Sequence, residues 1–155
     1  MPKKILTVAF VAVLMATAFN TASARDWSKA QLQVWNVILD SYKDIDAQDA
    51  DWSSKWVFED AMVWGTSYPM PRNRDSIKRW DTYNFSGGKP HLSEYTPVAI
   101  VVHGDTAVAH YYSSSASEDR EGKHETTHGR CTDILAKDGK SWKFIAWHCY
   151  DEPSD

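Results

Sequence analysis

The second half of the chain contains four consecutive segments that favour β-strands. Each segment is rich in β-branched and aromatic residues, and turn motifs separate one segment from the next. The predicted strands cover residues 92–102, 106–117, 123–136 and 141–150. Gly104-Asp105 and Asp138-Gly139 are typical of hairpin turns, and the charged residues 118–122 form the remaining connection. Consecutive strands joined by short turns predict an antiparallel sheet.

Three helices are expected before these strands. Apolar residues recur at helical spacing over residues 29–48, after a possible capping box that begins at Ser28. Asp49 can cap a short second helix, and Asn73 can cap a third that stops before two glycines. Residues 61–64 have the composition of a short strand. Helices followed by an antiparallel meander predict an α+β domain.

Residues 1–24 have the organisation of an export signal. Two lysines come first, an apolar stretch covers residues 5–19, and a small-residue cleavage motif ends at Ala24. We therefore expect a mature chain that begins at Arg25 and is periplasmic or secreted. The apolar stretch is shorter than the roughly 20 residues of a membrane span, so no membrane attachment is expected after cleavage.

The remaining residues, 25–155, suit a single domain. Their length allows one sizeable hydrophobic core. The formal charge of the whole chain is −4, and it becomes about −6 when the two lysines of the signal are removed. Nucleic-acid binding needs a clustered basic surface, so a nucleic-acid partner is not expected.

The two cysteines, Cys131 and Cys149, lie on two strands that follow one another. Export would place them in an oxidising compartment, where a disulfide can form. If Asp138-Gly139 is a strict two-residue turn, the cysteines lie on opposite faces of the sheet and cannot be joined. One additional loop residue would bring them to the same face as diagonal neighbours. The sequence leaves both arrangements open.

The order of predicted elements resembles the nuclear transport factor 2-like superfamily, which includes SnoaL-like domains and ketosteroid isomerase relatives. The C-terminal segment is similar to the calcium/calmodulin-dependent kinase II association domain group. The residues that carry this similarity are Asp138-Gly-Lys140, Trp142, Ala146-Trp-His148 and Pro153. Residues 25–155 are on this basis expected to form a single SnoaL-like domain.

This resemblance implies a cone-shaped, curved antiparallel sheet wrapped around a long N-terminal helix, with two shorter helices. It also implies a pocket at the wide end of the cone and a homodimer formed through the sheet. Relatives use the pocket for proton transfer, dehydration, epoxide opening or ligand capture, and others perform no chemistry. No obvious counterpart of the isomerase constellation, a carboxylate base facing a tyrosine and a protonated carboxylic acid, is visible in the sequence.

The strand before the last hairpin has two faces, and only one of them can line the pocket. Alternation places His128 and Arg130 on one face and Cys131 and Asp133 on the other. The resemblance implies that His148 points inward, so we assign His128, Arg130 and His148 to the pocket. This assignment requires the additional loop residue in the hairpin.

Arg130 is the strongest candidate ligand-binding residue. A guanidinium in a partly apolar cavity offers five donors for a carboxylate or enolate. The alternative is a structural ion pair with Asp44, Asp46 or Glu125.

The histidines of the sheet are candidate catalytic residues. Imidazole titrates near neutral pH, so His110, His128 and His148 can serve as general acids or bases. Tyr112 shares a face with His110 and can donate a hydrogen bond from its hydroxyl. The alternative for each is a hydrogen-bonded structural role.

Candidate pocket walls come from the helical half of the chain. Tyr42 can direct its hydroxyl into the cavity, and Asp46, one turn later, is either a carboxylate base or a solvent-exposed residue. Trp56, Trp64 and Trp80 can supply flat apolar surfaces for a ring-shaped ligand, or they can simply belong to the core.

Neither a metal nor a cofactor is expected. His124 and His128 are about 13 Å apart if they lie on one strand, too far to share an ion. A zinc site would instead need His110, His128 and His148 to converge across strands. No glycine-rich phosphate-binding loop is present.

Two functions from different classes fit these observations. The first is an exported pocket protein that performs acid/base isomerase, cyclase or dehydratase chemistry on a small apolar or aromatic carbonyl or acid compound. The second is a non-catalytic ligand-binding or oligomeric assembly module. The sequence does not decide between them.

Overall fold

The computed structural model describes residues 26–65 and 68–152, and the predicted signal lies outside these residues. The described part of the chain is α+β, with three helices and a six-stranded sheet. The elements are α1 (Lys29–Asp46), α2 (Trp52–Trp56), β1 (Met62–Gly65), β2 (Arg72–Asn73), α3 (Arg74–Phe85), β3 (Lys89–His103), β4 (Thr106–Glu118), β5 (His124–Asp138) and β6 (Ser141–Asp151). No helix among them is long and apolar enough to span a membrane.

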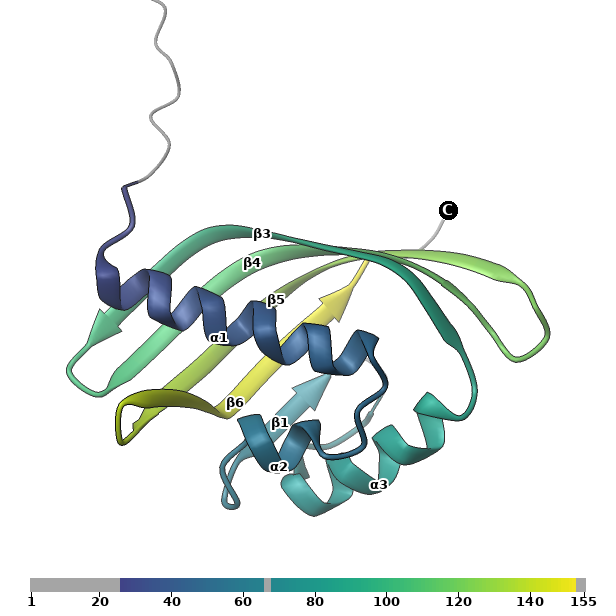
Figure 1. Cartoon of the computed structure of the whole chain (residues 1–155), viewed down its shortest axis with the longest axis horizontal. Coiled ribbons are helices and arrows are strands. Elements are labelled where there is room, and N and C mark those ends of the chain that lie inside the picture. The colour runs from purple at the N-terminus through teal and green to yellow at the C-terminus, as the bar shows by residue number, and fades with distance from the viewer. Residues whose placement is uncertain (1–25, 66–67, 153–155) are drawn as a thin grey trace, which may run out of the picture.

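The sheet is mixed rather than purely antiparallel as expected. Its strand order is β2-β1-β6-β5-β4-β3, and β3 to β6 form the predicted meander. Strand β1 pairs in parallel with β6, and the two strands are far apart in the chain, separated by β2, α3, β3, β4 and β5. Figure 1 shows α1 lying across the inner face of the curved sheet, with α2 and α3 beside β1.

Helix α1 begins as its capping motif predicts. The Ser28 hydroxyl accepts a hydrogen bond from the Gln31 amide, and the Gln31 side chain accepts one from the Ser28 amide. The helix ends at Asp46, two residues before the predicted Gln48, because Gln48 adopts a left-handed conformation with a φ of 56°. Its buried residues Val34 and Ile38 pack in the core beneath the sheet.

Helix α3 and the strands also follow local sequence signals. Asn73 caps α3 by accepting a hydrogen bond from the Ser76 amide at 3.0 Å. Strand β3 begins at Lys89, three residues before its predicted start at Leu92, because Lys89 and Pro90 still pair with β4. The pairing has a bulge between Pro90 and Leu92.

The predicted assignment of the two sheet faces is wrong. On β5 the buried residues are Gly129, Cys131, Asp133 and Leu135, so the side chains of His128 and Arg130 point to the outer face. On β4 the buried residues are Ala107, Ala109 and Tyr111, so His110 and Tyr112 also point outward. The inner face of the sheet is therefore the one that lacks the histidines and the arginine.

Two features of the last hairpin explain this error and join the cysteines. The hairpin loop is Gly139-Lys140, because Asp138 pairs with Ser141. A bulge then inserts Ile145, since Leu135 pairs with Phe144 whereas Ile134 pairs with Ala146. Trp142 and Phe144 face inward before the bulge, and His148 faces outward after it.

The combined shift makes Cys131 and Cys149 direct partners, and a disulfide joins them. The sequence left open whether the cysteines lie on opposite faces or on the same face, and the structure places them on the same face. They are direct partners rather than the diagonal neighbours that were expected for that arrangement.

Candidate functional site

A cavity of about 300 Å³ lies between the inner face of the sheet and helices α1 and α3. Aromatic side chains form much of its wall. Trp147 packs against Trp52 and Phe144, with ring centroids 5.9 Å apart in each pair, and Trp80 lines the cavity from α3. Such a wall is suited to a flat apolar ligand.

Asp133 is the most deeply buried carboxyl group in the cavity wall. Its residue is 2% exposed, and its carboxylate accepts a hydrogen bond of 2.8 Å from the Tyr111 hydroxyl. Burial raises the pKa of Asp133 to about 7, although the Tyr111 hydrogen bond acts in the opposite direction. Near neutral pH this carboxyl group therefore exists in both protonation states, as an acid/base catalyst requires.

The hydrogen bond to Asp133 extends into a chain of hydroxyl groups. The hydroxyl oxygens of Tyr111 and Tyr42 are 2.7 Å apart. Because the single Tyr111 proton points to Asp133, Tyr42 donates to Tyr111 when Asp133 is ionised. Burial raises the pKa of both phenols, so they keep their protons. The Tyr42 ring is held in place by stacking on Tyr95 at a centroid distance of 3.9 Å.

A second carboxyl group, Asp81 on α3, lines the same cavity. Burial raises the pKa of Asp81 to about 6, while the nearby charge of Arg72 lowers it. Its Oδ2 atom is buried and has no hydrogen-bond partner within the described residues. An unpartnered buried oxygen of this kind is energetically costly.

Arg72 is the cation of this cavity wall. Its guanidinium lies 4.0 Å from the centroid of the Tyr68 ring and 4.6 Å from that of Trp80. Stacking on two rings fixes the orientation of the guanidinium. Two carboxyl groups with pKa values near neutrality, the Tyr42 phenol and an arginine thus line one aromatic cavity.

The structure places two of the predicted ligand-binding residues at this cavity. Tyr42 contributes the hydroxyl described above, and Trp80 forms part of the wall. Trp56 does not line it, because its indole N–H donates to Asp44 on α1 at 2.8 Å. Trp64 is 47% exposed and packs edge-on against His148 on the outer face.

The other predicted site residues lie together on the outer face of the sheet. They border a shallow groove of about 420 Å³, and the residues that line it include His110, Tyr112, Arg130 and His148. Nδ1 of His110 is 2.8 Å from the Thr132 hydroxyl. His128 lies on the same face and, with Tyr112, lines a neighbouring hollow.

The acids considered as partners of Arg130 have other contacts. Asp44 pairs with Lys55, and Glu125 with Lys123. Asp46 accepts a hydrogen bond of 3.0 Å from Ser93, and partial burial raises the pKa of its carboxyl group. The Arg130 guanidinium lies over the Tyr150 ring, 5.5 Å from its centroid.

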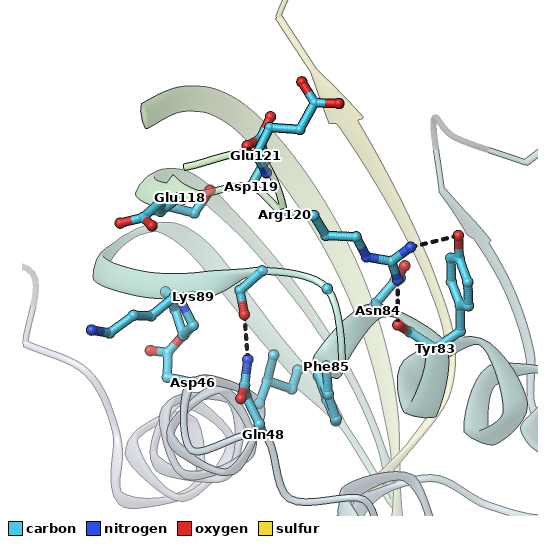
Figure 2. Close-up of a pocket in the computed structure, with 15 residues that line it drawn as sticks. Asp46, Gln48, Tyr83, Asn84, Phe85, Lys89, Glu118, Asp119, Arg120 and Glu121 are labelled. Atoms are coloured by element: carbon cyan, nitrogen blue, oxygen red, sulfur yellow. Dashed lines mark hydrogen bonds between the residues drawn. The ribbon is translucent and has the colours of Figure 1, made fainter. Parts of the chain in front are cut away.

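A larger hollow of about 590 Å³ lies near the end of α1, the end of α3 and the β4–β5 hairpin. Figure 2 shows Arg120 extending from the hairpin to Tyr83, where it donates to the hydroxyl at 2.8 Å and to the carbonyl at 2.9 Å. Gln48 donates to the Gly88 carbonyl at 2.7 Å. These donors are already used in linking the elements, so this hollow is a weaker candidate than the cavity at Asp133.

Sequence reasoning missed most residues of the inner cavity, among them Tyr68, Arg72, Asp81 and Asp133. Asp133 had a visible signal, because it is an acid in the middle of an otherwise apolar strand face. Asp81 and Arg72 had no such signal in the sequence, since each lies in a polar stretch typical of a solvent-exposed surface.

Comparison with solved structures identifies the class of fold. A ketosteroid isomerase-like protein from Erwinia carotovora atroseptica superposes with a TM-score of 0.73 at 11% identity, covering 83% of this chain and 100% of that one. A candidate dehydratase of the nuclear transport factor 2-like family from Streptomyces avermitilis gives 0.68 at 16% identity, with coverages of 82% and 100%. A candidate calcium/calmodulin-dependent kinase II association domain from Exiguobacterium sibiricum gives 0.68 at 8% identity, with coverages of 84% and 98%. These similarities define a nuclear transport factor 2-like fold.

Residues 32–149 match the SnoaL-like domain family, and the chain belongs to this family. No functionally curated protein matches the chain. Because SnoaL-like folds host unrelated activities, the function must be argued from the cavity itself.

Proposed function

We propose that the protein is an acid/base enzyme of the isomerase, cyclase or dehydratase type. Its substrate would be a small apolar or aromatic compound with a carbonyl or acid group. The observation that carries this proposal is Asp133, a buried carboxyl group with a pKa of about 7 that faces an aromatic cavity. Perturbed carboxyl groups of this kind are characteristic of catalytic sites.

In the proposed mechanism Asp81 is the base. Its carboxylate removes a proton from the carbon next to the substrate carbonyl, and the C–H electron pair forms the enolate. Protonated Asp133 donates a hydrogen bond to the enolate oxygen, while the hydroxyls of Tyr111 and Tyr42 hold Asp133 in position. When the substrate has a carbon–carbon double bond beside that carbon, the enolate is a dienolate. Asp81 then returns the proton to the far carbon of the dienolate and the double bond moves into conjugation with the carbonyl, so no other reactant is consumed in the isomerisation.

Cyclic ketones incubated with the mature protein in D₂O provide the test. Proton transfer to Asp81 predicts exchange of the α-hydrogens, which ¹H NMR detects. Asp81→Asn should slow exchange by about 10²- to 10⁴-fold, the usual contribution of a general base. If the wild-type protein catalyses no exchange for any ketone but retains one of them in the cavity, the non-catalytic ligand carrier is the correct function.

We also propose that the chain is exported and forms a homodimer through the outer face of the sheet. The disulfide between Cys131 and Cys149 supports export, because such bonds persist in oxidising compartments. Exposed apolar residues on β3 and β4 support the dimer, among them Val101 at 58% and Tyr112 at 55% exposure. Sedimentation velocity tests the dimer, and N-terminal sequencing of the secreted protein tests cleavage before Arg25.

The catalytic assignment of His110, His128 and His148 stays a prediction. Their shared outer face supports a role in the dimer interface instead. If they are catalytic, His148→Gln abolishes exchange whereas Asp81→Asn leaves it unchanged.

A further inference from the structure

Two histidines and a glutamate converge at the far end of the sheet from the β5–β6 hairpin. His91 comes from β3, Glu118 from β4 and His124 from β5, so each belongs to a different neighbouring strand. Their potential ligand atoms all lie within 4.8 Å of one another. None of these residues lines the cavity at Asp133.

The register of the strands creates this cluster. Glu118 and His124 are direct partners across the β4–β5 pair, so their side chains share one face of the sheet. His91 lies within the bulge between Pro90 and Leu92, where strict alternation is interrupted. Bulges commonly redirect a side chain in this way. The neighbouring pairing of Lys89 with Glu118 brings β3 into place beside them.

The distances between these side chains are close to the distances between ligand atoms around a bound transition-metal ion. Nε2 of His91 is 3.4 Å from Oε2 of Glu118, and the rings of His91 and His124 are 5.5 Å apart between centroids. Ligands bound to zinc at 2.0–2.2 Å in a tetrahedron are about 3.3 to 3.6 Å from one another. The His91–Glu118 separation already lies in this range. The remaining separations need to close by at most about 1.5 Å, which rotation of partly exposed side chains provides.

The three side chains are also of the types that bind zinc. Two imidazoles and one carboxylate form a known ligand set for zinc that leaves a position open for water. Both cysteines are joined in the disulfide, so no thiol competes for the ion. The adjacent cation Lys123 is paired with Glu125 at 3.1 Å, which reduces its repulsion of a bound metal.

We propose that His91, Glu118 and His124 form a binding site for a divalent transition-metal ion, with Zn²⁺ as the representative probe. The ion would connect β3, β4 and β5 at their shared end. Glu118 also borders the hollow near the end of α1 (Figure 2), so bound metal would hold one side of that hollow. The site is separate from the proposed catalytic cavity and does not depend on its activity.

Titration of the tag-free mature protein with ZnCl₂ by isothermal calorimetry tests this proposal. We expect one site per chain. His91→Ala and His124→Ala should each weaken binding at least about tenfold, and Glu118→Gln should also weaken it. His103→Ala is the matched control, because it removes an exposed histidine from the opposite end of β3 and should leave the affinity unchanged.

X-ray absorption of the zinc-loaded wild-type protein provides a readout that needs no variant. Two imidazoles with additional oxygen ligands are expected in the first coordination sphere. The proposal is wrong if the wild type shows no saturable zinc binding, if His91→Ala and His124→Ala bind as tightly as wild type, or if the spectrum contains fewer than two imidazoles.

Discussion

Replacing Asp133 by asparagine should stabilise the protein relative to the wild type more strongly as the pH rises. The Tyr111 hydroxyl can still donate to the asparagine carbonyl, so the side chain keeps its shape and one hydrogen bond. Asparagine, however, cannot ionise. The variant therefore isolates the free energy of burying a charged carboxylate in the cavity wall.

The pKa of Asp133 in the folded state is about 7, against an ordinary value of 3.8. The folded protein consequently binds more protons than the unfolded chain between these two pH values, and the wild type loses stability as the pH rises through this window. The 2% exposure of Asp133 leaves little solvent screening. The full cost of ionisation reaches about 4 kcal/mol above pH 7, and roughly 2 to 3 kcal/mol of it arises between pH 5 and pH 8.

Urea unfolding followed by tryptophan fluorescence measures this effect. The free energy of unfolding of Asp133→Asn, minus that of the wild type, should rise by roughly 2 to 3 kcal/mol from pH 5 to pH 8. Asp105→Asn, an exposed acid in the β3–β4 turn, serves as the control. If the difference for Asp133→Asn stays constant over this range, the carboxyl group does not titrate near neutral pH and the reasoning fails.

Three further predictions concern other parts of the molecule. Enolisation rates should decline below a pH of about 6, where Asp81 becomes protonated, and a pH–rate profile without this decline would exclude Asp81 as the base. Replacing both cysteines by serine should reduce the free energy of unfolding by about 3 kcal/mol, because the bridge spans 18 residues, and an unchanged urea midpoint would contradict this. Tyr112→Arg should convert the proposed dimer to a monomer in sedimentation experiments without altering the cavity, whereas Thr106→Arg, outside the apolar surface, should leave the dimer intact.

Local signals in the sequence were sufficient to predict most of the secondary structure. Ser28 and Asn73 cap the helices as expected, and Gly104 and Gly139 occupy hairpin turns with φ values of 57° and 62°. These features depend on a few neighbouring residues. The parallel pairing of β1 with β6 depends instead on where a short strand packs in space, and no local pattern reports it.

The composition of the site was harder to predict, because it depends on which face of the sheet points inward. The bulge at Ile145 exchanges the two faces along β6, and nothing in the residue types marks it. The histidines and Arg130 therefore resembled pocket residues although they point outward. Asp133 and Tyr111 have the burial and hydrogen bonding expected of a site, and both properties require the folded chain.

Locating a bound ligand tests the central claim most directly. We would titrate ¹⁵N-labelled mature protein with 2-naphthol, an aromatic ring whose acidic hydroxyl resembles an enolate, and map the NMR shift changes. Binding in the inner cavity predicts changes at Tyr42, Asp133 and Trp147 that Asp133→Asn reduces. Changes confined to Tyr112, Arg130 and His148 would place the ligand on the outer face and contradict the assignment of the site.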